Sequence, residues 1–267
     1  MQIASFRSWY IVRDLVDRYG TAVVCAPIDE WAPVEQDGNE LRALLGRDWA
    51  RYRSLGHPAL RRRFAATRSL LKHAAAVVLR ADPTAIELAY GPSGRPYLRG
   101  CDSLDLSLSH TEELLVVGLT TRGLVGVDVE RADRPLYDTG LGRQICTPYE
   151  LGLLDAMPDA DRNPGLVRLW TLKEAYSKAI GQGMRFRFTE FGFTPGADDA
   201  NPAVLTPDGA PGTGSEWSLR TFLLADGFCL SAVVYDVGFG EPADTAARTM
   251  LDPGLTAALL SAMEQEP

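Results

Sequence analysis

The stretch GLVGVDVER, residues 123–131, constrains the fold most, because β-branched residues alternate along it with other residue types. Such alternation predicts a β-strand. Asp128 and Glu130 lie two residues apart in this stretch, so both side chains leave the strand on the same face. Two carboxylates held side by side repel each other unless water or a cation lies between them. The pattern therefore raises the question of a bound cation.

Neighbouring patterns predict the rest of an α+β fold. Alternating or β-rich runs indicate strands at 21–28, 104–110, 113–120, 216–224 and 228–237. Helices are expected at 40–53, 58–80, 139–145, 148–156 and 164–181, with a short terminal helix at 252–265. Thr121-Arg122-Gly123 separates two strands and indicates a hairpin. We expect two successive lobes, 1–122 and 123–267, although no sequence repeat proves a duplication.

Charge and composition exclude several classes of protein. No apolar run approaches the roughly 18 residues that a membrane span requires. Arg7, Arg13 and Asp14 interrupt the N-terminal segment, which therefore lacks the apolar core of a signal peptide. We expect a cytoplasmic protein that does not bind membranes. The net charge of −8 argues against a nucleic-acid partner. The four scattered cysteines form no CxxC pair and are expected to be reduced.

One basic block stands out in this acidic chain. Residues 51–80 contain eight arginines and lysines and no acidic residue. Within the predicted helix 58–80, Arg61, Arg68 and Lys72 lie beside an apolar stripe and are expected to border a cleft. The block indicates a local anion site, with a solvated helix face as the plainer alternative. The expected stripe is Leu60, Phe64, Leu71, Ala75 and Val78.

The predicted helix 164–181 carries polar residues on a second face. Trp170, Glu174 and Lys178 follow one another at intervals of four residues. A tryptophan is rarely left in water, so this face is expected to contact another part of the protein. The expected buried stripe is Leu169, Leu172, Tyr176 and Ile180.

These segments together predict a site for phosphate chemistry. Asp128, Glu130 and Glu174 supply oxygen ligands that suit a hard divalent ion such as magnesium, whereas no His/Cys cluster has zinc spacing. His110 ends a strand and either binds a phosphate or has a structural role. A metal beside cations is typical of phosphoryl transfer, and no P-loop motif is present.

Three motifs in order then identify a family. LSLSHT, GVDVE and WTLKEAYSK, at residues 106–111, 126–130 and 170–178, resemble the 4′-phosphopantetheinyl transferases, in particular the large two-lobed type that activates polyketide and nonribosomal peptide synthetases. GRPYL (94–98) and RRRFAATRSLLK (61–72) resemble further elements of that family. The resemblance covers roughly residues 55–195.

The resemblance implies a fold and a reaction. Two similar lobes, each a small antiparallel sheet packed with a long helix, would be related by a pseudo-twofold axis. The enzyme would transfer the 4′-phosphopantetheine arm of coenzyme A to a serine of an acyl or peptidyl carrier protein, with Mg²⁺, and release adenosine 3′,5′-bisphosphate. A chain of this length is expected to be a monomer, and a role in antibiotic biosynthesis follows from the type.

The resemblance also assigns residues. The metal ligands would be Asp128, Glu130 and Glu174. Lys178 would contact the phosphates and protonate the leaving group. The general base stays open between Glu174 and a metal-held water that it orients. His110 joins Glu174 and Lys178 as a catalytic residue.

The nucleotide would be held by a further group of side chains. Ser109, His110 and Lys178 would contact phosphates. The adenosine 3′-phosphate would be held by Arg68 and Arg95, with Arg63, and Arg51 and Arg53 would add to this patch.

Two positions depart from the family pattern. Thr111 replaces a serine, and Asp105 stands where asparagine is usual and adds a negative charge near the expected anion site. The segment MRFRF, 184–188, offers two arginines among aromatics and is expected either to face the acidic carrier or to form an edge strand. Two other functions remain open, a magnesium-dependent nucleotide phosphohydrolase and a non-catalytic protein that binds coenzyme A or the carrier.

Overall fold

The computed structural model describes residues 3–5, 9–33, 38–183, 187–193, 202–212 and 216–236. The first half of the chain forms β1 (Ile3–Ser5), α1 (Trp9–Tyr19), β2 (Thr21–Pro27), α2 (Ile28–Trp31), α3 (Asn39–Leu45), η1 (Gly46–Asp48), α4 (Trp49–Ser54), α5 (Pro58–Leu79), η2 (Pro83–Ala85), β3 (Leu88–Tyr90), β4 (Pro96–Leu98), β5 (Asp105–His110) and β6 (Leu114–Thr120). The second half forms β7 (Gly123–Arg131), η3 (Tyr137–Thr139), α6 (Gly142–Ile145), α7 (Pro148–Ala156), α8 (Asp159–Ala179), η5 (Phe188–Glu190), β8 (Gly192–Phe193), β9 (Val204–Leu205), β10 (Trp217–Leu224) and β11 (Phe228–Asp236). The predicted terminal helix lies outside the described residues.

Two sheets organise these elements. The first has the strand order β1-β2-β6-β5, in which only the β1–β2 pair is parallel, and the second has the antiparallel order β10-β11-β7. The expected hairpin at 121–123 is wrong, because β7 pairs with β11 and not with β6. The chain crosses between sheets there, and Thr121 N donates to Gly20 O (2.8 Å), which fixes the corner to the end of α1.

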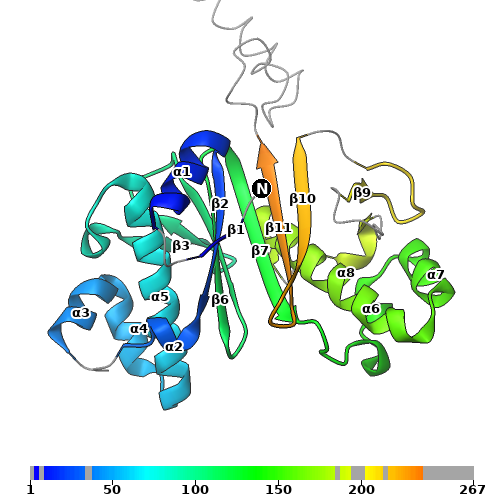
Figure 1. The fold of residues 1–267 in the computed structure, drawn as a ribbon, viewed down its shortest axis with the longest axis horizontal. Helices are drawn as coiled ribbons and strands as arrows, with labels where there is room; N and C mark the ends of the chain where they lie inside the picture. Colours follow the sequence, from blue (N-terminus) through cyan, green and yellow to red (C-terminus); the bar gives the residue numbers. More distant parts are fainter. Residues whose placement is uncertain are drawn as a thin grey trace, which may run out of the picture.

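The sheets and helices form layers (Figure 1). One core joins α1 and α5 to the first sheet, and another joins α8 to the second sheet. A third core of valines and other apolar residues, among them Val23, Val116, Val127 and Leu230, comes from facing strands of both sheets. The α+β fold with a long helix against each small sheet is therefore confirmed, and the two sheets bury apolar surface against each other.

Helix α5 is buried differently from the prediction. Leu60 of the expected apolar stripe is 42% exposed, whereas Arg68 and Lys72 of the expected cleft row are only 8% and 3% exposed. The helix is rich in alanine, so the first sheet approaches one side while α3 and α4 pack on another. Lys72 donates to Leu44 O, and Arg61 Nε donates to Leu55 O (2.6 Å). The basic row therefore borders the interior.

Helix α8 lies close to β7 because of one glycine. A Cβ at Gly126 would lie 1.8 Å from Ala175 O and 2.6 Å from Ala179 N. Only glycine lets the two backbones approach this closely. The predicted burial of Leu169, Leu172 and Tyr176 is confirmed, whereas Ile180, the last residue of the predicted stripe, is only partly buried. No helix among the described residues has the length and hydropathy to cross a membrane.

Candidate active site

The three sequence motifs meet at the carboxylate of Asp128 on β7. Ser109 Oγ on β5 donates to Asp128 Oδ1 at 2.7 Å. Lys178 Nζ on α8 donates to the same oxygen at 2.7 Å, and also to Ser109 Oγ and Val127 O at 3.1 Å each. Charged donors on a largely buried carboxylate make strong hydrogen bonds. Hydrogen bonds therefore join one residue from each of the three motifs.

Strand β5 reaches β7 through side chains rather than through a backbone ladder. Asp105 Oδ2 accepts from Val125 N at 2.7 Å, and Ser107 Oγ accepts from Val127 N at 3.1 Å. These acceptors are two residues apart and share one face of β5 with Ser109. They satisfy N–H groups along the edge of β7, so the alternation of LDLSLSH aligns Ser109 with Asp128.

Two of the predicted metal ligands present unsatisfied oxygens. Asp128 Oδ2 and Glu174 Oε1 are buried and have no hydrogen-bond partner among the described residues. Burial, and then the charge of Asp128, raise the pKa of Glu174 to about 7. Buried carboxylate oxygens without donors are costly unless a cation compensates them. The donor set therefore fits a hard divalent ion.

The third predicted ligand, Glu130, accepts hydrogen bonds from two side chains outside the three-carboxylate cluster. Its Oε1 accepts from Trp170 Nε1 at 3.3 Å and from Arg134 Nη1. Burial, and then the charge of Asp128, raise its pKa, while Arg134 opposes this shift. The Trp170 face of α8 therefore contacts the protein, as expected from the sequence.

The three carboxylates are neighbours but are not preassembled. In the part of the chain that the structure describes, no three His, Cys, Asp or Glu side chains are grouped closely enough to hold a metal ion as they stand. Lys178 engages Asp128, and Arg134 engages Glu130. Each cation therefore neutralises one carboxylate.

A second set of predicted residues surrounds His110 at the end of β5. Partial desolvation, and then the charges of Arg63 and Lys178, lower the pKa of His110. The lowered pKa favours the neutral imidazole near pH 7, in which one ring nitrogen can donate and the other can accept a hydrogen bond. Arg63 is half-buried on α5, and no side-chain hydrogen bond or ion pair of its guanidinium is found among the described residues.

Arg68 has an internal partner, which the sequence analysis did not foresee. Its Nε donates to Asp48 Oδ2 at 3.0 Å, and its guanidinium lies 4.5 Å from the ring centre of Phe64. Tyr90 OH donates to the same aspartate oxygen. The basic block contains no acidic residue, but Asp48 precedes it in sequence and folds back onto it. The neighbouring Arg51 lies over the rings of Phe64 and Tyr90, each at 5.7 Å.

Arg95 and Asp105 engage each other. Arg95 Nη2 donates to Asp105 Oδ2 and to Val125 O (2.9 Å), so it spans from the β3–β4 turn to β7. The unusual aspartate therefore neutralises this arginine. Burial raises the pKa of Asp105, and Arg95 opposes the shift. Thr111 Oγ1 accepts from Glu113 N and Leu114 N at 3.2 and 3.0 Å, so this hydroxyl caps the β5–β6 turn.

Lys173 is a motif residue whose role the sequence analysis missed. It is fully buried, pairs with Glu150 Oε2 at 2.8 Å, and donates to Phe188 O and Phe191 O at 2.7 and 2.6 Å. Glu150 also forms a capping box with Thr147 at the start of α7. The T-x-x-E spacing was a usable signal for the capping box, but nothing local indicated its pairing with Lys173.

The predicted carrier-facing segment is only partly described, since residues 184–186 lie outside the described ranges. Arg187 is exposed and pairs with Glu190 at 2.9 Å. Phe188 is buried against Trp170, with ring centres 5.9 Å apart, so this aromatic does not face a partner. Phe188 therefore packs against the tryptophan that donates a hydrogen bond to Glu130.

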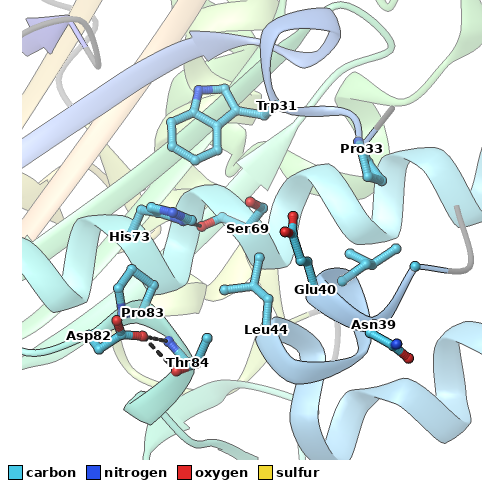
Figure 2. Close-up of a pocket in the computed structure, with 12 residues that line it drawn as sticks. Trp31, Pro33, Asn39, Glu40, Leu44, Ser69, His73, Asp82, Pro83 and Thr84 are labelled. Carbon is cyan, nitrogen blue, oxygen red and sulfur yellow. Dashed lines mark hydrogen bonds between the residues drawn. The ribbon is translucent and has the colours of Figure 1, made fainter. Parts of the chain in front are cut away.

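A cavity of about 790 Å³ lies elsewhere, between α2, α3, α5 and η2 (Figure 2). Trp31 and His73 face it on one side, and Glu40 and Leu44 on another. None of the predicted site residues is among the residues that the structure places around it. The chemistry-bearing side chains therefore lie apart from this cavity.

Comparison with known proteins agrees with the geometry. The model of the 4′-phosphopantetheinyl transferase superfamily matches residues 124–233. The chain is 33% identical over 220 residues to the 4′-phosphopantetheinyl transferase HetI of a Nostoc species, which covers 80% of this chain and 86% of the relative. It is 33% identical over 218 residues to a phosphopantetheinyl transferase of a Thraustochytrium species, which covers 76% of this chain and 75% of the relative.

A more distant relative is the 4′-phosphopantetheinyl transferase of Bacillus subtilis, 24% identical over 140 residues, or 52% of this chain and 61% of the relative. All three relatives are named as transferases. The alternative of a nucleotide phosphohydrolase therefore has no support among them.

Proposed function

The chain belongs to the 4′-phosphopantetheinyl transferase superfamily, and on that premise we propose that it moves the 4′-phosphopantetheine arm of coenzyme A onto a serine of an apo acyl or peptidyl carrier protein. The serine oxygen attacks the phosphorus next to the pantetheine, and the bridging P–O bond of the pyrophosphate breaks. Adenosine 3′,5′-bisphosphate leaves. The observation that carries the proposal is the convergence of Ser109 and Lys178 on Asp128.

A divalent ion, magnesium or manganese, would be held by Asp128, Glu130 and Glu174. The unsatisfied oxygens of Asp128 and Glu174 support this ligand set. When bound, the ion supplies positive charge that offsets the pyrophosphate and favours the transition state.

Two residues of α8 would move the protons. Lys178 lies between Ser109 and Asp128, within reach of a phosphate placed there, and gives a proton to the departing oxygen. Glu174 accepts the proton of the carrier serine, directly or through a water that it orients. The buried Oε1 of Glu174, which has no hydrogen-bond donor among the described residues, supports this role.

The adenosine end would be held on the α5 side. Ser109 and His110 contact the phosphates, and Arg63 supplies the cation for the 3′-phosphate. The charge of Arg63 close to the His110 imidazole supports this placement. Arg68, which is paired with Asp48, would support this patch from the protein interior. Arg95 would contribute the guanidinium N–H groups that do not bind Asp105 or Val125 O.

The partners would be coenzyme A and carrier domains of polyketide or nonribosomal peptide synthetases, with one site per monomer. The test is incubation with coenzyme A and a panel of apo carrier proteins, read by intact mass. A gain of one phosphopantetheine on a carrier, with release of adenosine 3′,5′-bisphosphate, is expected.

Two outcomes would contradict the proposal. Cleavage of coenzyme A without any carrier would point to hydrolysis. Binding of coenzyme A with no turnover, equal in the wild type and Glu174→Gln, would point to a non-catalytic binding protein.

A further inference from the structure

The carboxylate of Glu130 accepts, at one oxygen, hydrogen bonds from two donors of different charge. Trp170 Nε1 and Arg134 Nη1 both donate to Oε1, one from α8 and one from the segment after β7. The indole N–H is neutral, whereas the guanidinium carries a full positive charge. The two donors therefore orient the same carboxylate but affect a nearby cation in opposite ways.

The Trp170 donor is fixed in place. Its ring packs against Phe188, with ring centres 5.9 Å apart. Lys173 Nζ holds the Phe188 carbonyl at 2.7 Å and is itself paired with Glu150 in the interior. This chain of contacts leaves the indole little freedom, so Glu130 keeps one hydrogen bond whatever its other partner does.

Arg134 is held at its backbone, and its guanidinium has Glu130 as its one side-chain partner among the described residues. Its carbonyl accepts from Asn163 Nδ2 at 2.9 Å, but its side chain is 45% exposed, against 21% for Glu130. A long, exposed arginine side chain exchanges rotamers freely and forms weak ion pairs. Arg134 can therefore leave Glu130 without disturbing the fold.

We propose that Arg134 is a resident counter-ion that competes with the divalent ion for Glu130, while Trp170 positions the carboxylate to receive that ion. The inference rests on the proposed function, because the ion is the one proposed there. The absence of a preassembled group of three carboxylates among the described residues agrees with it. Arg134 then sets how tightly the ion binds, and Trp170 keeps the ligand in place.

The test is binding of Mn²⁺ to the full chain, measured as loss of the free-ion electron paramagnetic resonance signal. Arg134→Gln keeps a neutral donor and removes the charge, so we expect Mn²⁺ to bind about threefold to tenfold more tightly. Trp170→Phe keeps the ring and removes the N–H, so we expect binding weaker by a similar factor. Arg131→Gln is the matched control, because Arg131 pairs with Glu113 and Asp133 instead, and its affinity is expected to stay within about twofold of the wild type.

Each outcome decides a separate point. Unchanged or weaker binding in Arg134→Gln would overturn the competition, and wild-type binding in Trp170→Phe would overturn the positioning role. Arg134 is at the surface, so its variant decides the competition even when Trp170→Phe unfolds, which circular dichroism would show. A wild type that binds no Mn²⁺ even with coenzyme A present would overturn the ion of the proposed function, and this inference with it.

Discussion

At the residue scale, the site is a set of charges, buried to different degrees, that are only partly matched. Lys178 and Arg134 bring two positive charges to Asp128 and Glu130, while Glu174 is left with an unsatisfied oxygen. A surplus of negative charge in a low-dielectric site is unfavourable for the apo protein and favourable for cation binding. The same imbalance therefore predicts both ligand binding and pH dependence.

The first residue-scale prediction concerns Asp128. Asp128→Ala removes the acceptor shared by Ser109 and Lys178, and one ligand of the proposed ion, so turnover should fall by about a hundredfold or more. Steady-state transfer to an apo carrier at limiting magnesium measures this. Asp133→Asn, an exposed acid on the same segment, is the control that should retain activity. Wild-type rates in Asp128→Ala would rule out the assignment.

The second concerns Glu174 in the metal-free protein. Its pKa in the fold, about 7, lies above its ordinary value of 4.5. The folded state therefore holds the proton more tightly, and stability falls as the pH rises from about 4.5 through 7. Glu174→Gln removes this penalty and should stabilise the protein at pH 8 by up to about 3 kcal/mol, with little difference near pH 4. Denaturant unfolding in EDTA at several pH values measures it, and a pH-independent difference would contradict it.

The third separates two arginines of α5. Arg63→Ala should raise the KM for coenzyme A and affect dephospho-coenzyme A much less, since only the former has a 3′-phosphate. Arg68→Ala leaves Asp48 buried without its charge partner and should lower the free energy of unfolding by about 3 kcal/mol. Kinetics with both substrates and denaturant unfolding measure these effects. Equal losses with both substrates in Arg63→Ala would remove its proposed role.

At the scale of elements, α8 is the part that assembles the site. It presents Glu174 and Lys178 toward β7 and Lys173 toward the interior, where that lysine binds the carbonyls of Phe188 in η5 and of Phe191, the residue before β8. Burial lowers the pKa of Lys173, while Glu150 opposes this shift. Helix α8 can bring these side chains to Asp128 only when it lies very close to β7. Gly126 allows this close approach because it has no Cβ.

The element-scale prediction follows from that contact. Gly126→Ala places a Cβ 1.8 Å from Ala175 O, so α8 has to move away from β7. We expect a loss of about 3 kcal/mol or more in stability, together with loss of activity. Gly152→Ala in the exposed middle of α7, where an added Cβ meets nothing within 4 Å, is the control and should stabilise by about 0.5–1 kcal/mol. Thermal unfolding of both variants measures this, and equal melting temperatures would contradict the close contact.

At the scale of the whole molecule, the site draws residues from both sheets. Ser109 and His110 lie on β5 of the first sheet, and Asp128 lies on β7 of the second. The core between the sheets holds them face to face. The predicted lobe boundary at 122/123 coincides with the crossing between sheets and stays a prediction.

The whole-molecule prediction concerns ligand stabilisation. Coenzyme A and magnesium together should raise the melting temperature by more than the sum of their separate effects, because bound together they would bridge groups from both sheets. At a concentration of 100 Kd, a ligand that binds only the folded state adds about 2.7 kcal/mol. Differential scanning calorimetry with each ligand alone and with both measures it. Strictly additive shifts would argue against a shared site.

The amino-acid sequence by itself determined most of the long strands and helices and indicated the chemistry. It did not predict α1, and the single helix expected at 40–53 is α3, η1 and α4 in the structure. Alternation predicted β5, β6, β7, β10 and β11, and the three motifs indicated both the family and the carboxylates. Local patterns suffice for this, because side-chain periodicity follows from backbone geometry alone.

Only the tertiary structure decided which charges pair. Asp48 with Arg68, and Glu150 with Lys173, come together through packing between elements. It also decided that β7 leaves β6 and joins the other sheet. Strand pairing and ion pairing depend on which apolar faces are buried together, and that is a property of the whole core rather than of any one segment.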